Sequence, residues 1–151
     1  MSLLFQLVVA FFSTLGFALL FHLRPKLLVP ACLGGVLTWA IYVISKQYID
    51  GVFWPCLIAS FMAAGYASLL ANRTKEPLAV FYILAEVPLI PGSGLFNTMS
   101  SIASLNWDAA ASFGLTTASF VLAIALSLAA FAVLTGLKDA ALSKLSDTDK
   151  D

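Results

Sequence analysis

The sequence predicts an all-α membrane protein, a polytopic bundle of about five spanning helices in which the fourth is broken at a Pro-Gly turn near the midplane. Three observations predict this fold: an apolar composition, polar loops at membrane-spanning intervals, and one cluster of prolines and glycines inside an apolar segment. The 151 residues are 61% hydrophobic and 11% charged, with a mean hydropathy of +0.98. Soluble domains carry about 25% charged residues. The lipid bilayer is therefore the expected surrounding of this chain.

The same composition argues against several function classes. The formal net charge is zero, so we expect no nucleic-acid partner, because a basic surface is missing. Zinc-type Cys and His spacing, a P-loop and a dinucleotide-binding glycine motif are absent from the sequence. We therefore expect no metal, no cofactor and no enzyme activity. An intramembrane hydrolase is a remote alternative, since Ser93 has no candidate base except His22, which should lie near the membrane surface.

Three apolar segments come first, at residues 3–21, 27–44 and 52–71. Each approaches the roughly 20 residues with which a helix crosses the hydrocarbon core. Gly34 and Gly35 give the second segment a small face that permits close helix packing. His22, in the loop before it, is either a proton relay or an interfacial residue, and we prefer the interfacial interpretation.

The fourth apolar segment contains the cluster of prolines and glycines. Its first half, residues 77–90, should end in a helix break, and its second half, residues 93–105, should complete the crossing. Prolines remove backbone donors, and glycines release the restraint on φ. Backbone freed from helical hydrogen bonds at membrane depth persists only where protein buries it or where it lines a watery cavity. We therefore expect the functional centre at this break, which is made by Pro88, Pro91, Gly92 and Gly94.

Polar side chains continue from the break along the second half-helix. Their spacing of i, i+4, i+7 and i+11 places them on one helical face, where they either line a path or make hydrogen bonds between helices. The free N–H groups of residues 93–97 and the positive helix end would suit a substrate carboxylate. The predicted site and path residues are Glu86, Pro88, Pro91, Gly92, Ser93, Gly94, Asn97, Thr98, Ser100 and Ser104, and the polar face consists of Ser93, Asn97, Ser100 and Ser104.

Glu86 is the only acidic residue that we place inside a spanning segment. An ionised carboxylate among apolar side chains is energetically unfavourable, so intramembrane carboxylates are rarely kept without a function. Glu86 therefore either carries a coupling proton or is a hydrogen-bonded or ion-paired structural residue at a subunit contact.

The last apolar segment is expected at residues 109–137. The membrane part then covers residues 1–138, and residues 139–151 form a frayed, polar cytoplasmic tail. With five crossings, the loops and tail on one side of the membrane contain seven cations, and the loops on the other side contain only Lys46. The positive-inside rule therefore predicts a multi-pass protein of the cell (plasma or inner) membrane, with its amino terminus outside and its carboxyl terminus cytoplasmic. The seven cations are Arg24, Lys26, Arg73, Lys75, Lys138, Lys144 and Lys150.

Three parts of the sequence carry a resemblance to a known family. They are FHLRPKLL at residues 21–28, Gly35 with the segment from Trp39 to Tyr42, and VPLIPGSGLFNTM at residues 87–99. Together they resemble the small subunit of the split threonine/serine exporter family, and the Pro-x-x-Pro-Gly segment is the most specific part. Glu86 departs from the family pattern, in which we expect an apolar residue there.

The resemblance implies a hetero-oligomeric secondary exporter. A larger homologous subunit would supply a cytoplasmic domain and a second membrane half with a related Pro-Gly segment. The cargo classes implied are small amino acids, threonine and serine, or a dicarboxylate such as succinate. If the partner half also crosses five times, the two halves are inverted repeats. The alternative from another class is a membrane scaffold or assembly subunit that does not itself transport.

Overall fold

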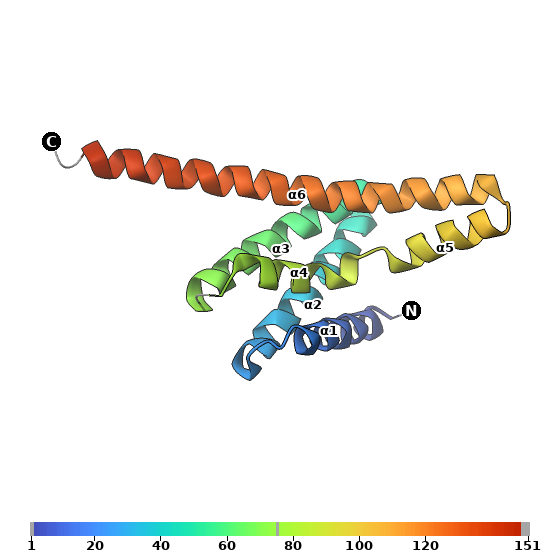
Figure 1. Cartoon of the computed structure of the whole chain (residues 1–151), viewed down its shortest axis with the longest axis horizontal. Coiled ribbons are helices and arrows are strands. Elements are labelled where there is room, and N and C mark those ends of the chain that lie inside the picture. Colours follow the sequence, from blue (N-terminus) through green and yellow to red (C-terminus); the bar gives the residue numbers. More distant parts are fainter. Residues whose placement is uncertain (1, 75, 149–151) are drawn as a thin grey trace.

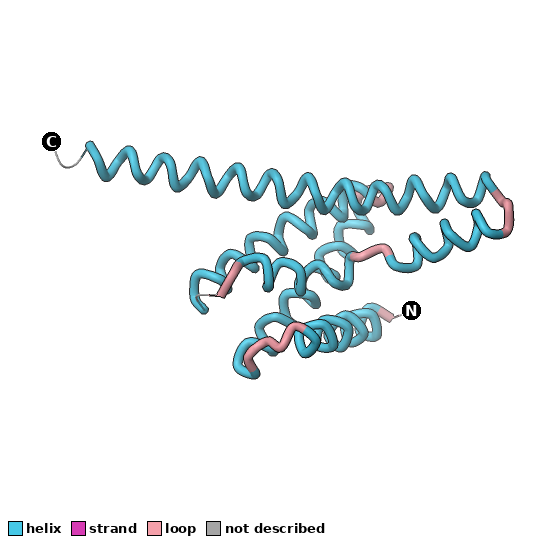
Figure 2. The backbone as a smooth tube through the Cα atoms, in the orientation of Figure 1, coloured by secondary structure: helices cyan, strands magenta, loops and turns pink. Residues whose placement is uncertain are grey.

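The computed structural model of the chain describes residues 2–74 and 76–148, with side chains up to residue 136. Within those ranges the regular secondary structure is all helical, joined by short loops, and contains no strand, as the sequence predicts (Figures 1 and 2). The elements in chain order are α1 (Leu3–Leu20), α2 (Pro25–Tyr48), α3 (Phe53–Thr74), α4 (Leu78–Glu86), the short 3-10 helix η1 (Val87–Leu89), α5 (Gly92–Ala103) and α6 (Trp107–Thr148).

Four of these helices are long and apolar enough to cross a membrane: α1, α2, α3 and the part of α6 from Trp107 to Gly136. The pair Leu78–Leu89 and Gly92–Ala103 passes the same test together and is bent by 56° at the break between them. Counting that bent pair as one span gives five crossings. The prediction of a broken fourth helix is therefore confirmed.

Several helix ends differ from the expected ones. α2 begins at Pro25, where proline suits the first turn, and it ends at Tyr48 rather than near residue 44. The apolar part of α6 ends close to residue 137, as expected, but the helix itself continues to Thr148. The frayed tail that we expected is therefore helical up to that residue, and residues 149–151 lie outside the described part of the chain.

Small residues allow the helices to approach one another closely. A Cβ atom on Gly35 would overlap the Thr14 hydroxyl of α1, and one on Gly34 would lie 3.0 Å from the Tyr66 ring of α3. The expectation of a small packing face at Gly34 and Gly35 is confirmed. In α3 the buried positions include Ala59, Ser60, Ala63, Ala64 and Ala67.

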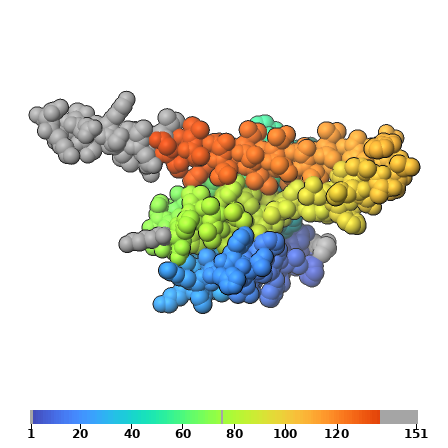
Figure 3. Space-filling model, viewed as in Figure 1, coloured from blue at the N-terminus to red at the C-terminus, as the bar shows by residue number. Residues whose placement is uncertain are grey.

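α5 and α6 form a hairpin that extends beyond the bundle of α1 to α4 (Figure 1). α5 packs mainly on α6 and has no fully buried residue. In the space-filling view, α6 lies along one edge, α4 and α5 occupy the middle, and α1 and α2 lie along the opposite edge (Figure 3). Beyond the break, α5 extends from the bundle along the first part of α6, while α6 also packs on α3 (Figure 1).

Candidate functional site

The break consists of two residues outside helical geometry, Ile90 and Pro91. Ile90 is extended, with φ −60° and ψ 120°, which is the conformation that a following proline favours. Pro91 has φ −79° and ψ 58°. Because Pro91 has no N–H group, the helical hydrogen bonding that ends at Leu89 cannot continue through it.

The two glycines of the break, Gly92 and Gly94, were expected to provide freedom of φ, but the structure does not use them in this way. Among the described residues, Gly51 is the glycine with positive φ, so neither Gly92 nor Gly94 is needed for a left-handed conformation. A Cβ atom on Gly94 would overlap the Thr117 hydroxyl of α6, so glycine there permits close contact between helices. Around Gly92 nothing lies within 4 Å of such an atom. The expected reason, freedom of φ, is therefore wrong for both.

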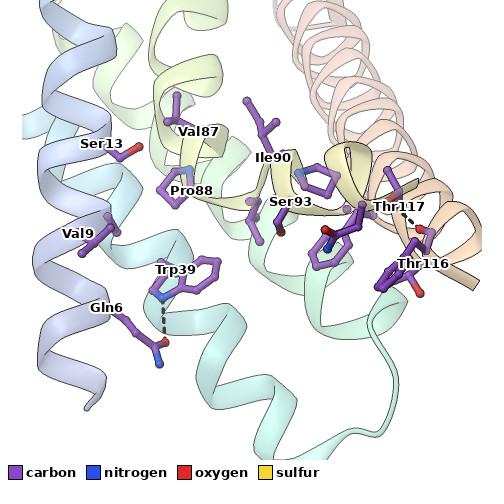
Figure 4. A pocket seen from close by; sticks show the side chains of 18 of the residues that line it. Gln6, Val9, Ser13, Trp39, Val87, Pro88, Ile90, Ser93, Thr116 and Thr117 are labelled. Carbon is purple, nitrogen blue, oxygen red and sulfur yellow. Dashed lines mark hydrogen bonds between the residues drawn. The ribbon is translucent and has the colours of Figure 1, made fainter. Parts of the chain in front are cut away.

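A cavity of about 790 Å³ opens beside the break, between α1, α2, η1, α5 and α6 (Figure 4). Its wall is mostly apolar and contains no charged side chain among the described residues. The predicted site residues that line it are Pro88, Pro91, Gly92, Ser93, Gly94 and Asn97. The residues of the predicted break therefore lie in the wall of a cavity.

The other four predicted site residues do not line this cavity: Glu86, Thr98, Ser100 and Ser104. The Thr98 hydroxyl donates to the Gly94 carbonyl oxygen at 2.7 Å, and its methyl group lies 3.6 Å from a Cβ placed on Gly114 of α6. The Ser104 hydroxyl donates to the Ser100 carbonyl oxygen within α5. The predicted polar face therefore reaches the cavity only at Ser93 and Asn97.

Sequence reasoning missed the polar groups that the other helices contribute. The Trp39 indole N–H of α2 donates to the side-chain oxygen of Gln6 of α1 at 3.2 Å, and both side chains line the cavity (Figure 4). Ser13, Thr116 and Thr117 also lie in its wall. The sequence offered one indication of these groups: Gln6 carries a polar amide within the first, otherwise mostly apolar segment.

The amino-terminal end of α5 faces the cavity through Gly92, Ser93 and Gly94. The Gly92 N–H donates to the Ile90 carbonyl oxygen at 2.8 Å, and the Leu95 N–H donates to the Pro91 carbonyl oxygen at 3.0 Å. The free amides at this end are therefore those of Ser93 and Gly94, a smaller set than the expected residues 93–97. A helix end of this kind attracts negative charge.

Glu86 lies deep in the protein rather than at the cavity. Its exposed fraction is 5%, and neither carboxylate oxygen has a hydrogen-bond partner among the described residues. The Ser60 hydroxyl of α3 lies beside it, but that hydroxyl pairs with the Tyr82 hydroxyl at 3.0 Å. Neither Ser60 nor Tyr82 lines the cavity. The carboxylate and the cavity are thus separate features of the same broken helix.

The comparison with protein families gives one match. The family model described as "Threonine/Serine exporter, ThrE" matches residues 6–134, which include the break, Glu86 and all of the cavity wall except Phe5. No curated protein and no solved structure matches the chain.

Proposed function

The chain belongs to the threonine/serine exporter family, and from this premise we propose that it is one membrane half of a secondary exporter for small metabolites that carry a carboxylate. Its cargo would be threonine, serine or a dicarboxylate such as succinate. The family is one of transporters, and the five helical crossings describe a multi-pass membrane protein.

The observation that carries the proposal is the end of α5 at the cavity. The amides of Ser93 and Gly94 lie at the positive end of a 12-residue helix, and such an end binds a carboxylate without any cationic side chain. A volume of about 790 Å³ is within the roughly 300–1,000 Å³ of small-molecule sites. The hydroxyl of Ser93 and the amide of Asn97 supply hydrogen-bonding groups for the rest of a small polar cargo.

The open side of this region supports a partner subunit. α5 has no fully buried residue, and Ser93 and Ser100 are exposed on it. Polar side chains are rarely left facing lipid, so protein is their expected cover. A larger homologous subunit with a cytoplasmic domain and its own broken helix would cover this surface and would place a second helix end at a shared cavity.

The ion pair between Arg24 and Glu76 supports the proposed orientation. Arg24 precedes α2, Glu76 lies between α3 and α4, and their side chains approach to 3.4 Å. The loops to which the positive-inside rule assigns a cytoplasmic position are therefore neighbours. We propose that both loops face the cytoplasm, with the amino terminus outside.

The experiment measures uptake of labelled threonine, serine and succinate into inverted membrane vesicles. The vesicles carry this chain alone, the partner alone, or both. Uptake that requires both subunits and saturates with cargo is the expected result. Equal uptake with the partner alone would contradict the proposal and favour the scaffold function, in which this chain only assembles or stabilises its partner.

A further inference from the structure

Glu86 has no described role in the cavity, although it immediately precedes the cavity wall in the chain. It ends α4, and the next residues, Val87, Pro88 and Leu89, form η1 and line the cavity. The Glu86 side chain is 5% exposed and makes no hydrogen bond among the described residues. A buried polar group without a protein partner is uncommon in folded proteins and requires an explanation, such as a functional role.

The nearest polar groups come from α3 and from α4 itself. Ser60 and Cys56 are fully buried on α3, and Tyr82 precedes Glu86 by one helical turn. The Tyr82 hydroxyl is shared between the Ser60 hydroxyl at 3.0 Å and the Ile124 carbonyl oxygen of α6 at 3.5 Å. These groups connect the surroundings of Glu86 to α6 without offering it a positive charge.

The other elements provide no ion-pair partner for Glu86. On α2 the buried titratable side chains are Cys32 and Tyr42, neither of which is cationic. The exposed Lys46 lies over the Tyr42 ring at 5.8 Å. α1, η1 and α5 contain no titratable residue. The described side chains of α6, residues 107–136, contain only Asp108, which is exposed at the start of that helix.

An ionised carboxylate in this position has no cation beside it among the described residues, and the neighbouring Ser60 hydroxyl is already paired with the Tyr82 hydroxyl. In apolar surroundings such a charge is much less favourable than the neutral acid. The conformation described here therefore suits the protonated acid. Ionisation requires the end of α4 to move so that the carboxylate meets water.

Resting on the exporter function above, we propose that Glu86 is a proton-carrying group in a closed site of its own, coupled to the cargo cavity through η1. In one conformation the carboxylate takes a proton from water outside and closes as the neutral acid. In the other it releases that proton to cytoplasmic water, while cargo leaves in the opposite direction. The cargo never touches Glu86, because the link between them is the backbone of three residues, Val87, Pro88 and Leu89.

The test uses proteoliposomes that contain both subunits, with either wild-type Glu86 or Glu86→Gln. The amide keeps the shape of the neutral acid but cannot exchange a proton. We expect Glu86→Gln to retain counterflow exchange of cargo at close to the wild-type rate and to lose net transport driven by a pH gradient at least ten-fold. Glu76→Gln is the matched control, because Glu76 lies in a loop and pairs with Arg24, and it should retain both activities.

Gradient-driven transport by Glu86→Gln at the wild-type rate would overturn the proposal. Loss of exchange and of gradient-driven transport together would place Glu86 in cargo binding or in packing, and would also overturn it. If wild-type subunits transport none of the cargoes, the exporter function fails, and the proton site is then judged by spectroscopy of this chain alone.

Infrared spectroscopy provides that separate measurement. A carboxylic acid C=O band at neutral pH that vanishes in Glu86→Gln should be that of protonated Glu86. Tyr82→Phe removes the neighbouring hydroxyl and should shift this band and the pH profile of net transport without changing exchange. Absence of the band from the folded wild-type chain would overturn the proposal without reference to transport.

Discussion

Gly92 and Gly94 lie two residues apart in the first turn of α5 and have opposite surroundings. A side chain at Gly92 would enter open space in the cavity, whereas a side chain at Gly94 would meet Thr117 of α6. Substitutions at these two positions therefore separate occupation of the cavity from helix packing.

Replacing Gly92 with leucine should stop export without unfolding the protein. The new side chain occupies the cavity beside the α5 end, while no atom within 4 Å of its Cβ has to move. We expect a loss of at least ten-fold in cargo uptake and a change in unfolding free energy below about 1 kcal/mol, near the cost of a helical glycine replaced by a better helix former. Gly65→Leu is the control, since Gly65 is also surrounded by open space but lies outside this cavity. Wild-type uptake by a well-expressed Gly92→Leu protein would remove the cavity from the export path.

Replacing Gly94 with alanine should weaken the contact between α5 and α6. The added methyl group overlaps the Thr117 hydroxyl, which donates to the Phe113 carbonyl oxygen at 2.8 Å and is therefore held in place. Overpacking of this kind typically costs 1–3 kcal/mol. The double variant Gly94→Ala with Thr117→Ala should recover most of that loss, because the next contact is an ordinary 3.5 Å to the Thr117 Cβ. Denaturant titration in detergent measures both, and an unrescued double variant would contradict the steric explanation.

The sequence predicted the residues that make the break but not those that face it. Prolines act on their own backbone, so Pro88 and Pro91 can be interpreted locally. The bond between Trp39 and Gln6 joins residues 33 positions apart and depends on how α1 packs on α2. The overlap at Gly94 likewise depends on the approach of α6. Local rules contain no information about such distant pairs.

At the scale of elements, the geometry of α4, η1 and α5 depends on Pro91. Proline disfavours a helical ψ at the residue before it, and Ile90 is extended, so we attribute the 56° angle between the two half-helices to Pro91. Pro91→Ala removes this restriction and restores an N–H donor. The bend should then decrease.

Spin labels at Ile83→Cys and Ile102→Cys, two exposed positions on either side of the break, report that change. The distance between them should increase in Pro91→Ala as the two halves straighten. Pro30→Ala is the control, because Pro30 lies inside α2 and its carbonyl oxygen, which accepts from the Tyr66 hydroxyl, is kept. An unchanged distance in Pro91→Ala would mean that tertiary contacts, rather than Pro91, hold the bend.

Helix existence was predictable from hydropathy, whereas helix ends were not. The apolar segments predicted outside the break coincide with α1, α2, α3 and α6 to within a few residues, but α6 continues through charged residues to Thr148. Alternating charges are compatible with an exposed helix as well as with a frayed tail. The apolar stretch of a sequence ends where the bilayer ends, but a helix can continue beyond it into water.

At the scale of the whole molecule, the orientation depends on five crossings and on the cations of one side. A reporter fused after Asp151 should therefore give a cytoplasmic signal, and one inserted at Gly51, in the short connection between α2 and α3, should give an external signal. The reverse pair of signals, or the same signal from both, would contradict the orientation and the inverted-repeat arrangement with the partner.

The length of α6 makes the thickness of the surrounding lipid part of the mechanism. Its apolar part has 30 residues, or about 45 Å of helix, against a hydrocarbon core of about 30 Å. Such a positive hydrophobic mismatch is relieved by tilting or by thickening the nearby bilayer. Because α5 packs on α6, a change in tilt carries the α5 end with it. Export in proteoliposomes should therefore be fastest at one acyl-chain length of the lipid and slower at shorter and longer ones. Deleting one helical turn of α6 within residues 125–136 should move this optimum toward thinner bilayers.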